Sequence, residues 1–88
     1  MNERDNIHIE RIKNELLFIE KSLKGMEKDN FLNNDIIQRA VSMSLISIGE
    51  SARHLSDEFK NNHPEIEWVQ IIAVRNIAAH GYWQLDME

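Results

Sequence analysis

The chain has 88 residues, enough for a single domain spanning 1–88 but too few for a large hydrophobic core. It has no cysteine, which excludes disulfides and Cys-based metal sites, and its net charge of −5 argues against non-specific nucleic-acid binding, though not against a local basic cleft. The first residues are polar and no apolar run is long enough to cross a bilayer, so we expect no signal peptide, no membrane segment and a cytoplasmic location.

The first predicted helix covers residues 6–26. Its apolar residues recur at alternating spacings of three and four, which forms one continuous stripe: Ile9, Ile12, Leu16, Ile19, Leu23 and Met26. The connection that follows, 25–34, is expected to be a loop in which Phe31 folds back onto the core. Asn33 or Asn34 is expected to cap the next helix.

The second predicted helix covers residues 35–55. One face, expected to pack on the first helix, carries Ile37, Val41, Ser44, Ile48, Ala52 and Leu55. The opposite face has an apolar centre, Met43 and Ile46, between charged residues: Arg39, Glu50 and Arg53. Isolated exposed apolar residues are common. We favour a surface for a partner, because a core this small also needs one.

The last part of the chain predicts a short helical turn and a third helix. Ser56 is a suitable cap for the turn, and the His63-Pro64 pair should end it. Pro64 is then expected in the first turn of a helix over 65–79, which Gly81 would stop. With no strand pattern and few helix breakers, the fold class expected is all-α.

The stretch from Arg75 to Tyr82 is the candidate site. It places a permanent cation, Arg75, a near-neutral base, His80, and a phenol, Tyr82, within eight positions. Such groups could grip a phosphate and move a proton beside it. A lone histidine near a helix end is more often structural than catalytic, but His80 has these neighbours.

The spacing within this stretch constrains how the groups can meet. Asn76 and His80 are four residues apart and share a helix face, so Asn76 could orient the imidazole. Arg75 would lie about 140° from His80 on a regular helix. Either the helix ends before His80, or the two groups converge with those of a second chain, which makes a dimer interface an attractive place for the site.

The remaining polar residues are less specific. Glu50 could form a weak surface ion pair with Arg39 or Arg53, or it could hold Arg75 or His80, and the sequence leaves these readings even. The other histidines have no metal-ligand spacing with His80, and no phosphate-binding glycine loop is present. We therefore expect neither a metal nor a cofactor.

At these residues the chain resembles the HEPN superfamily, and within it the HepT-like proteins. The family motif is an arginine, four residues, a histidine, one residue and a tyrosine, which Arg75, His80 and Tyr82 match. Supporting features occur in the same order along nearly the whole chain: Phe31, Ile48-Gly49-Glu50, Leu55-Ser56, Pro64 and Trp68.

The resemblance implies an antiparallel helical bundle that forms a homodimer with the motif in a cleft between protomers. It implies a toxin that cleaves RNA without a metal, in which Arg75 binds the scissile phosphate and His80 acts as general base or acid. The implied antitoxin is an MNT-type nucleotidyltransferase that silences the toxin by attaching AMP to Tyr82.

The chain departs from the family at one point. Members usually continue past the motif with another amphipathic helix, which this chain lacks. An alternative therefore stays open, in which the protein is a non-catalytic helical dimerisation or regulatory module that binds a nucleotidyltransferase.

Overall fold

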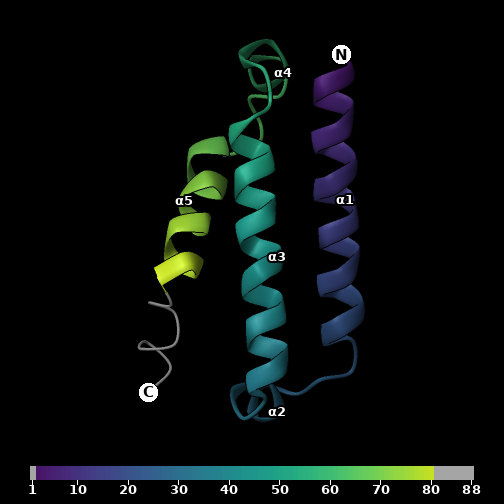
Figure 1. Ribbon diagram of the computed structural model, residues 1–88, viewed down its shortest axis with the longest axis vertical. Helices are drawn as coiled ribbons and strands as arrows, with labels where there is room; N and C mark the ends of the chain where they lie inside the picture. The colour runs from purple at the N-terminus through teal and green to yellow at the C-terminus, as the bar shows by residue number, and fades with distance from the viewer. Residues whose placement is uncertain (1, 81–88) are drawn as a thin grey trace.

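The structure, a computed structural model, describes residues 2–80, and for residues 77–80 it describes the backbone alone. This part of the chain is entirely helical apart from its connections. The helices are α1 (Glu3–Leu23), α2 (Lys28–Leu32), α3 (Asp35–Arg53), α4 (Asp57–Asn61) and α5 (Trp68–His80). The three long helices run antiparallel to their neighbours, with α3 between α1 and α5 (Figure 1). The predicted all-α, HEPN-like bundle is confirmed.

Helix α1 is shifted towards the N-terminus relative to the prediction of 6–26. It begins at Glu3, because the side chain of Asn2 accepts a 2.7 Å hydrogen bond from the backbone N–H of Asp5 and caps the first turn. It ends at Leu23, because Gly25 adopts a φ of +75°, which turns the chain away from the helical path. Met26 therefore lies outside the helix.

The predicted loop between the long helices contains a helix of its own, α2. Phe31 lies in this helix and is half-buried. The amide of buried Gln38 donates hydrogen bonds to the carbonyl oxygens of Phe31 and Leu32, at 2.7 and 2.9 Å. The side chain of Asn34 caps α3 through a 3.0 Å bond from the N–H of Ile37, which confirms one of the two predicted caps.

Helix α3 is the centre of the bundle. Ser44, Ile48, Ala52 and Leu55 of its predicted apolar face are buried, and Ser44 also donates to Glu15 of α1 at 3.2 Å. The opposite face of α3 was predicted to be a surface for a partner, but part of it is covered by α5. Helix α5 packs on the same helix beside Gly49, although Met43 remains 64% exposed.

Helix α5 begins three residues later than predicted, at Trp68. Pro64 therefore lies in a turn before the helix rather than in its first turn. The carbonyl oxygen of His63 accepts from the N–H of Ile66 at 3.2 Å and from the indole N–H of Trp68 at 3.1 Å. These bonds hold residues 63–66 in a turn, and they delay the start of the helix.

The bundle leaves apolar surface uncovered in the part that the structure describes. An apolar groove of about 340 Å³ runs over α3 between α1 and α5, and its walls include Ile12, Leu16, Ile48, Trp68 and Ile71. The buried apolar residues are few, as the chain length predicts. None of the described helices has the length and apolarity that a membrane crossing requires.

The buried carboxylate of Asp5, near the start of α1, is hydrogen-bonded to Ser56, which follows the end of α3. Asp5 is 2% exposed and accepts hydrogen bonds from the backbone N–H of Ser56 at 2.8 Å and from its hydroxyl at 2.6 Å. The hydroxyl of Ser56 also accepts from the N–H of Phe59 at 3.1 Å, which confirms Ser56 as the cap of α4. The Ser56 side-chain and backbone bonds lower the pKa of Asp5 below its ordinary value.

This contact predicts how stability depends on pH. Because the folded-state pKa of Asp5 is lowered, its stabilising effect is present above the ordinary aspartate pKa and is lost as pH falls through the folded value. Ser56→Ala should lower the free energy of unfolding by about 1 kcal/mol through the lost cap alone. Urea unfolding should show a larger deficit at pH 7 than at pH 3, because pH 3 lies below the ordinary aspartate pKa and part of the stabilising effect is already lost there.

Ser22→Ala is the matched control, because Ser22 lies within α1 and makes no side-chain hydrogen bond among the described residues. It should be close to neutral at both pH values. An equal Ser56→Ala deficit at pH 7 and pH 3 would contradict the role given to Asp5.

Candidate active site

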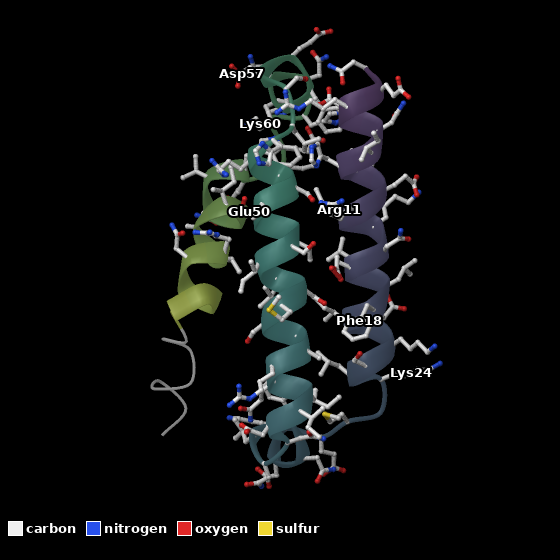
Figure 2. The ribbon with its side chains drawn as sticks, in the orientation of Figure 1. Arg11, Phe18, Lys24, Glu50, Asp57 and Lys60 are labelled. Carbon is white, nitrogen blue, oxygen red and sulfur yellow. The ribbon has the colours of Figure 1, made fainter. Side chains whose placement is uncertain are left out.

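The lack of a side chain on Gly49 sets the position of Arg75 against α3. A Cβ atom on Gly49 would meet the Cβ of Arg75 more closely than two such carbons can approach. The absence of a side chain at this position therefore lets α5 come close to α3. As a result, the guanidinium of Arg75 lies beside Glu50, the next residue on α3. Glu50 is labelled in Figure 2.

Glu50 joins charged groups from both helices. Its Oε1 lies 2.9 Å from Nε of Arg75, and its Oε2 accepts a 3.1 Å hydrogen bond from Nη2 of Arg53. Nε2 of His54 is 3.9 Å from the same Oε2. The pKa of Glu50 is lowered, first by the Arg53 hydrogen bond and further by the charges of Arg53, Arg75 and His54, against the opposing effect of desolvation. At neutral pH Glu50 is therefore a carboxylate that contacts Arg75.

Glu50 was predicted either to form a surface ion pair with Arg39 or Arg53 or to hold Arg75 or His80, and the structure shows contacts with Arg53 and Arg75. Arg39 pairs with Asp35 at 3.6 Å, and both side chains are largely exposed. Glu50 pairs with Arg53 on its own helix and also reaches Arg75 on α5. The contact between helices is one that sequence spacing alone could not establish.

The guanidinium of Arg75 is only partly engaged. Its Nη1 donates a 3.0 Å hydrogen bond to the amide oxygen of Asn76, while the buried Nε contacts Glu50 as an ion pair without the direction of a hydrogen bond. Within residues 2–80, no described group accepts a hydrogen bond from Nη2, and the side chain is 42% exposed. One edge of the guanidinium is therefore open to an anion from solution.

Helix α5 continues through His80. This excludes the explanation that the helix ends before His80 and so brings Arg75 and His80 together. On a continuous helix Arg75 and His80 stay about 140° apart, so a single protomer does not place them side by side. The amide oxygen of Asn76 accepts a hydrogen bond from Arg75, and the suggestion that Asn76 could orient His80 stays a prediction. The side chain of His80 and the whole of Gly81 and Tyr82 lie outside the described residues.

Two histidines that the sequence did not single out lie near this network. The rings of His8 and His54 are stacked, with centroids 5.5 Å apart, and Nδ1 of His54 is 3.5 Å from Nη2 of Arg4. His54, the residue that caps the C-terminal end of α3, follows Glu50 by four residues, a spacing that could have revealed it. Its contact with Arg4 spans fifty residues of sequence and could not have been read from spacing.

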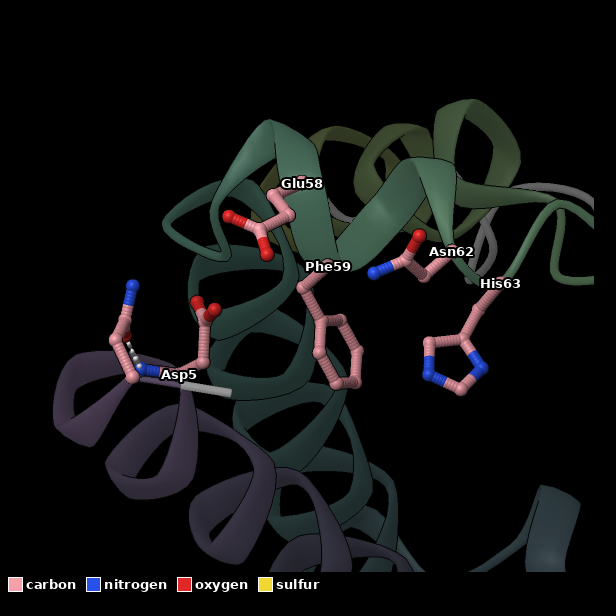
Figure 3. Close-up of a pocket in the computed structure, with 6 residues that line it drawn as sticks. Asp5, Glu58, Phe59, Asn62 and His63 are labelled. Atoms are coloured by element: carbon pink, nitrogen blue, oxygen red, sulfur yellow. Dashed lines mark hydrogen bonds between the residues drawn. The ribbon is translucent and has the colours of Figure 1, made fainter.

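A separate hollow of about 510 Å³ lies at the α1–α4 end of the molecule (Figure 3). Asp5 and Glu58 contribute carboxylates to its wall, beside Phe59, Asn62 and His63. It contains no arginine, and the two carboxylates would repel a phosphate. Over the described ranges, no cluster of three or more His, Asp or Glu side chains is arranged to hold a metal ion.

The architecture is that of a HEPN-like helical protein, with an arginine of the last described helix held against the central helix. The family model for HepT-like ribonucleases matches residues 12–88, and the chain belongs to that family.

Relatives from archaea and bacteria support this assignment. A candidate RNase of Methanocaldococcus jannaschii is 33% identical over 63 residues, which cover 72% of this chain and 58% of the relative. A second candidate RNase, from Caldanaerobacter subterraneus, is 30% identical over 90% of this chain and 70% of its own length. A protein of Thermococcus cleftensis named probable ribonuclease HepT is 30% identical over 91% of this chain and 73% of its own length.

The matched stretch thus leaves between about a quarter and two fifths of each of these three relatives unaligned. No solved structure matches the chain.

Proposed function

We propose that the protein is a metal-independent endoribonuclease, the toxin of a toxin–antitoxin pair, with Arg75 and His80 as its catalytic residues. The observation that carries the proposal is the guanidinium of Arg75, held beside Glu50 with one edge open, five residues before His80 on the same helix. The family membership and the name of the Thermococcus cleftensis relative support RNA as the substrate. We propose a cytoplasmic location, where such a protein would meet RNA.

The proposed reaction uses the 2′-hydroxyl of RNA as the nucleophile, which explains a preference for RNA over DNA. The 2′-oxygen attacks the adjacent phosphorus and loses its proton to a base, while the bond from phosphorus to the 5′-oxygen breaks. The leaving 5′-oxygen takes a proton, so the products carry a 2′,3′-cyclic phosphate and a 5′-hydroxyl. His80 serves as base or acid, and Arg75 stabilises the charge that develops on the phosphate.

The supporting residues have simpler roles in this proposal. Glu50 fixes the direction of the Arg75 guanidinium from α3, and Asn76 fixes it from α5. Both contacts leave the outer edge of the guanidinium for the substrate. An arginine positioned in advance loses less entropy when it binds phosphate than a freely rotating one does.

RNA cleavage by the purified protein tests the function. Wild-type protein should produce cyclic-phosphate ends, and EDTA should not change the rate. His80→Ala should abolish cleavage, whereas the matched control His63→Ala, which removes a histidine paired with Glu65, should retain it. Cleavage that survives His80→Ala, or that EDTA stops, would contradict the proposal.

We also propose a homodimer, because α5 is continuous and turns Arg75 and His80 towards different sides. Two copies of α5 facing each other could bring Arg75 of one protomer near the partner's His80. The exposed apolar side chain of Met43 and the nearby Ile46 are the surface predicted for the contact.

The dimer predicts a specific effect at Met43. Met43→Lys should weaken self-association, because a charge enters an apolar contact, while the monomer should be little affected because the side chain is already 64% exposed. Ile46→Glu should also weaken the dimer, but Ile46 is half-buried, so that change would reach the fold as well. Sedimentation of the wild type as a stable monomer at micromolar concentration would contradict the dimer.

Silencing by an MNT-type nucleotidyltransferase antitoxin is the remaining element of the proposal. The hydroxyl of Tyr82 would accept AMP, which adds negative charge and bulk two residues after His80. Tyr82→Phe should keep RNase activity and escape silencing by the cognate enzyme with ATP. Mass spectrometry of the wild-type protein should find an adenylate on the peptide containing Tyr82, and its absence would count against this step if the enzyme modifies a known substrate in the same tube.

A non-catalytic module that binds a nucleotidyltransferase is the second candidate. The acidic net charge of −5 favours it. Binding to the nucleotidyltransferase without RNA cleavage by the wild-type protein would support this function instead.

A further inference from the structure

A band of cationic side chains leads from α1 across the C-terminal end of α3 to Arg75. Nη2 of Arg4 lies 3.5 Å from Nδ1 of His54, and the ring of His54 stacks on that of His8. His54 and Arg53 then both approach Glu50, which contacts Arg75. We call the four arginines of this arrangement the cationic band: Arg4, Arg11 one turn beyond His8, Arg53 and Arg75. The rings of His8 and His54 lie among them.

The band gathers four arginines although the whole chain carries a net charge of −5. Desolvation lowers the pKa of His8, and the charges of His54, Arg11 and Arg4 lower it further, while Asp5 raises it. These effects place two permanent cations, Arg4 and Arg11, close to the ring of His8. The labelled Arg11 lies between α1 and α3, on the side where they face each other (Figure 2).

Two carboxylates beside the band, those of Asp5 and Glu50, are already engaged. Asp5 is buried and accepts both of its hydrogen bonds from Ser56. Glu50 contacts Arg53 and Arg75, and on the outer side of α1 Glu10 pairs with Lys13 at 3.4 Å. By contrast, Arg4, Arg11 and Arg53 are exposed, and their guanidinium groups have donors to spare for an anion.

We propose that the cationic band binds the phosphodiester backbone of single-stranded RNA and leads the strand to Arg75, a proposal that rests on the RNase function above. Arginine suits this task because its planar group can donate two parallel hydrogen bonds to one phosphate. The contacts between Arg4, His54, Glu50 and Arg75 make the band continuous from α1 to α5. The substrate contact would therefore extend well beyond the scissile phosphate.

The test measures affinity without cleavage. Fluorescence anisotropy would follow a labelled, 2′-O-methylated single-stranded RNA, which cannot undergo attack by the 2′-oxygen. Arg4→Gln and Arg11→Gln should each weaken binding roughly fivefold at about 0.1 M salt and reduce the slope of log affinity against log salt by about 0.7, the value for one lost phosphate contact on a single strand. The double variant should lose both contributions.

Lys21→Gln is the matched control. It makes the same change of charge at an exposed position in the last turn of α1, away from the band. It should alter affinity by less than about twofold, since the overall field changes but no phosphate contact is lost. Circular dichroism should show equal helicity in all variants, because each altered side chain is exposed.

Each outcome decides the proposal separately from the RNase function. Weaker binding of the Arg4 and Arg11 variants, with the control unchanged, supports the band even if the wild type does not cleave RNA. Affinities equal to the wild type overturn the band even if cleavage is normal. A wild type that does not bind the RNA at low salt also overturns it, as does a result in which the variants change only self-association.

Discussion

Arg75→Ala is expected to lower the rate of RNA cleavage by about 10²–10³-fold, the usual effect of removing one group that stabilises transition-state charge. The fold should be little affected. Glu50 keeps its 3.1 Å hydrogen bond to Arg53, so the change does not strand a carboxylate without a partner. Cleavage rates at saturating RNA, together with urea unfolding, would separate an effect on chemistry from one on stability.

Arg75→Lys sharpens this test. Lysine keeps the positive charge but has no planar guanidinium. It therefore cannot contact both Glu50 and Asn76 and present a free edge to the substrate at the same time. We therefore expect it to recover little of the lost rate. Arg39→Ala is the control, because it removes an exposed arginine whose ion pair among the described residues is with Asp35. An Arg75→Lys variant as fast as the wild type would show that charge alone matters and would contradict the positioning by Glu50.

Gly49→Ala is expected to lower the free energy of unfolding by about 1–3 kcal/mol, the range typical of overpacking. The added methyl group would collide with the Cβ of Arg75, which is too close to its backbone to move aside without a shift of α5. This loss should outweigh the gain of about 1 kcal/mol that alanine usually brings to a helix interior. Gly49→Val should be worse, because it adds still more volume at the same contact.

The same change should also impair RNA cleavage, because a displaced α5 moves Arg75 relative to Glu50. Asn14→Ala, at an exposed position of α1, reports the ordinary benefit of alanine in a helix and serves as the control. Urea unfolding provides the stability measurement. A Gly49→Ala variant more stable than the wild type would mean that α3 and α5 do not pack closely at this point.

The features that follow from local chemistry could be predicted from sequence. The capping of α3 by Asn34 and of α4 by Ser56 involves residues three positions apart, so a short stretch of sequence contains both partners. The apolar stripe of α3 follows from helical periodicity alone. The residues of the candidate site could likewise be selected from the spacing of Arg75 and His80, because that spacing is a property of one segment.

Prediction failed where one element depends on another. Helix α2 needs the side chain of Gln38, which bonds to its last carbonyl oxygens from α3. Helix α5 starts late because the indole of Trp68 and the N–H of Ile66 share the carbonyl of His63. A pattern of apolar residues does not record such bonds, so helix boundaries were the least accurate part of the prediction.

The arrangement of the candidate site depended on tertiary structure for the same reason. The sequence by itself determined that the chain carries an arginine, a histidine and an acidic residue suited to phosphate chemistry, and that they lie on predicted helices or at their ends. Only the packing of α5 against Gly49 decided that Glu50 contacts Arg75. Only the bundle brought Arg4 to His54 and Asp5 to Ser56, because contacts about fifty residues apart are set by how the helices pack and not by helical periodicity.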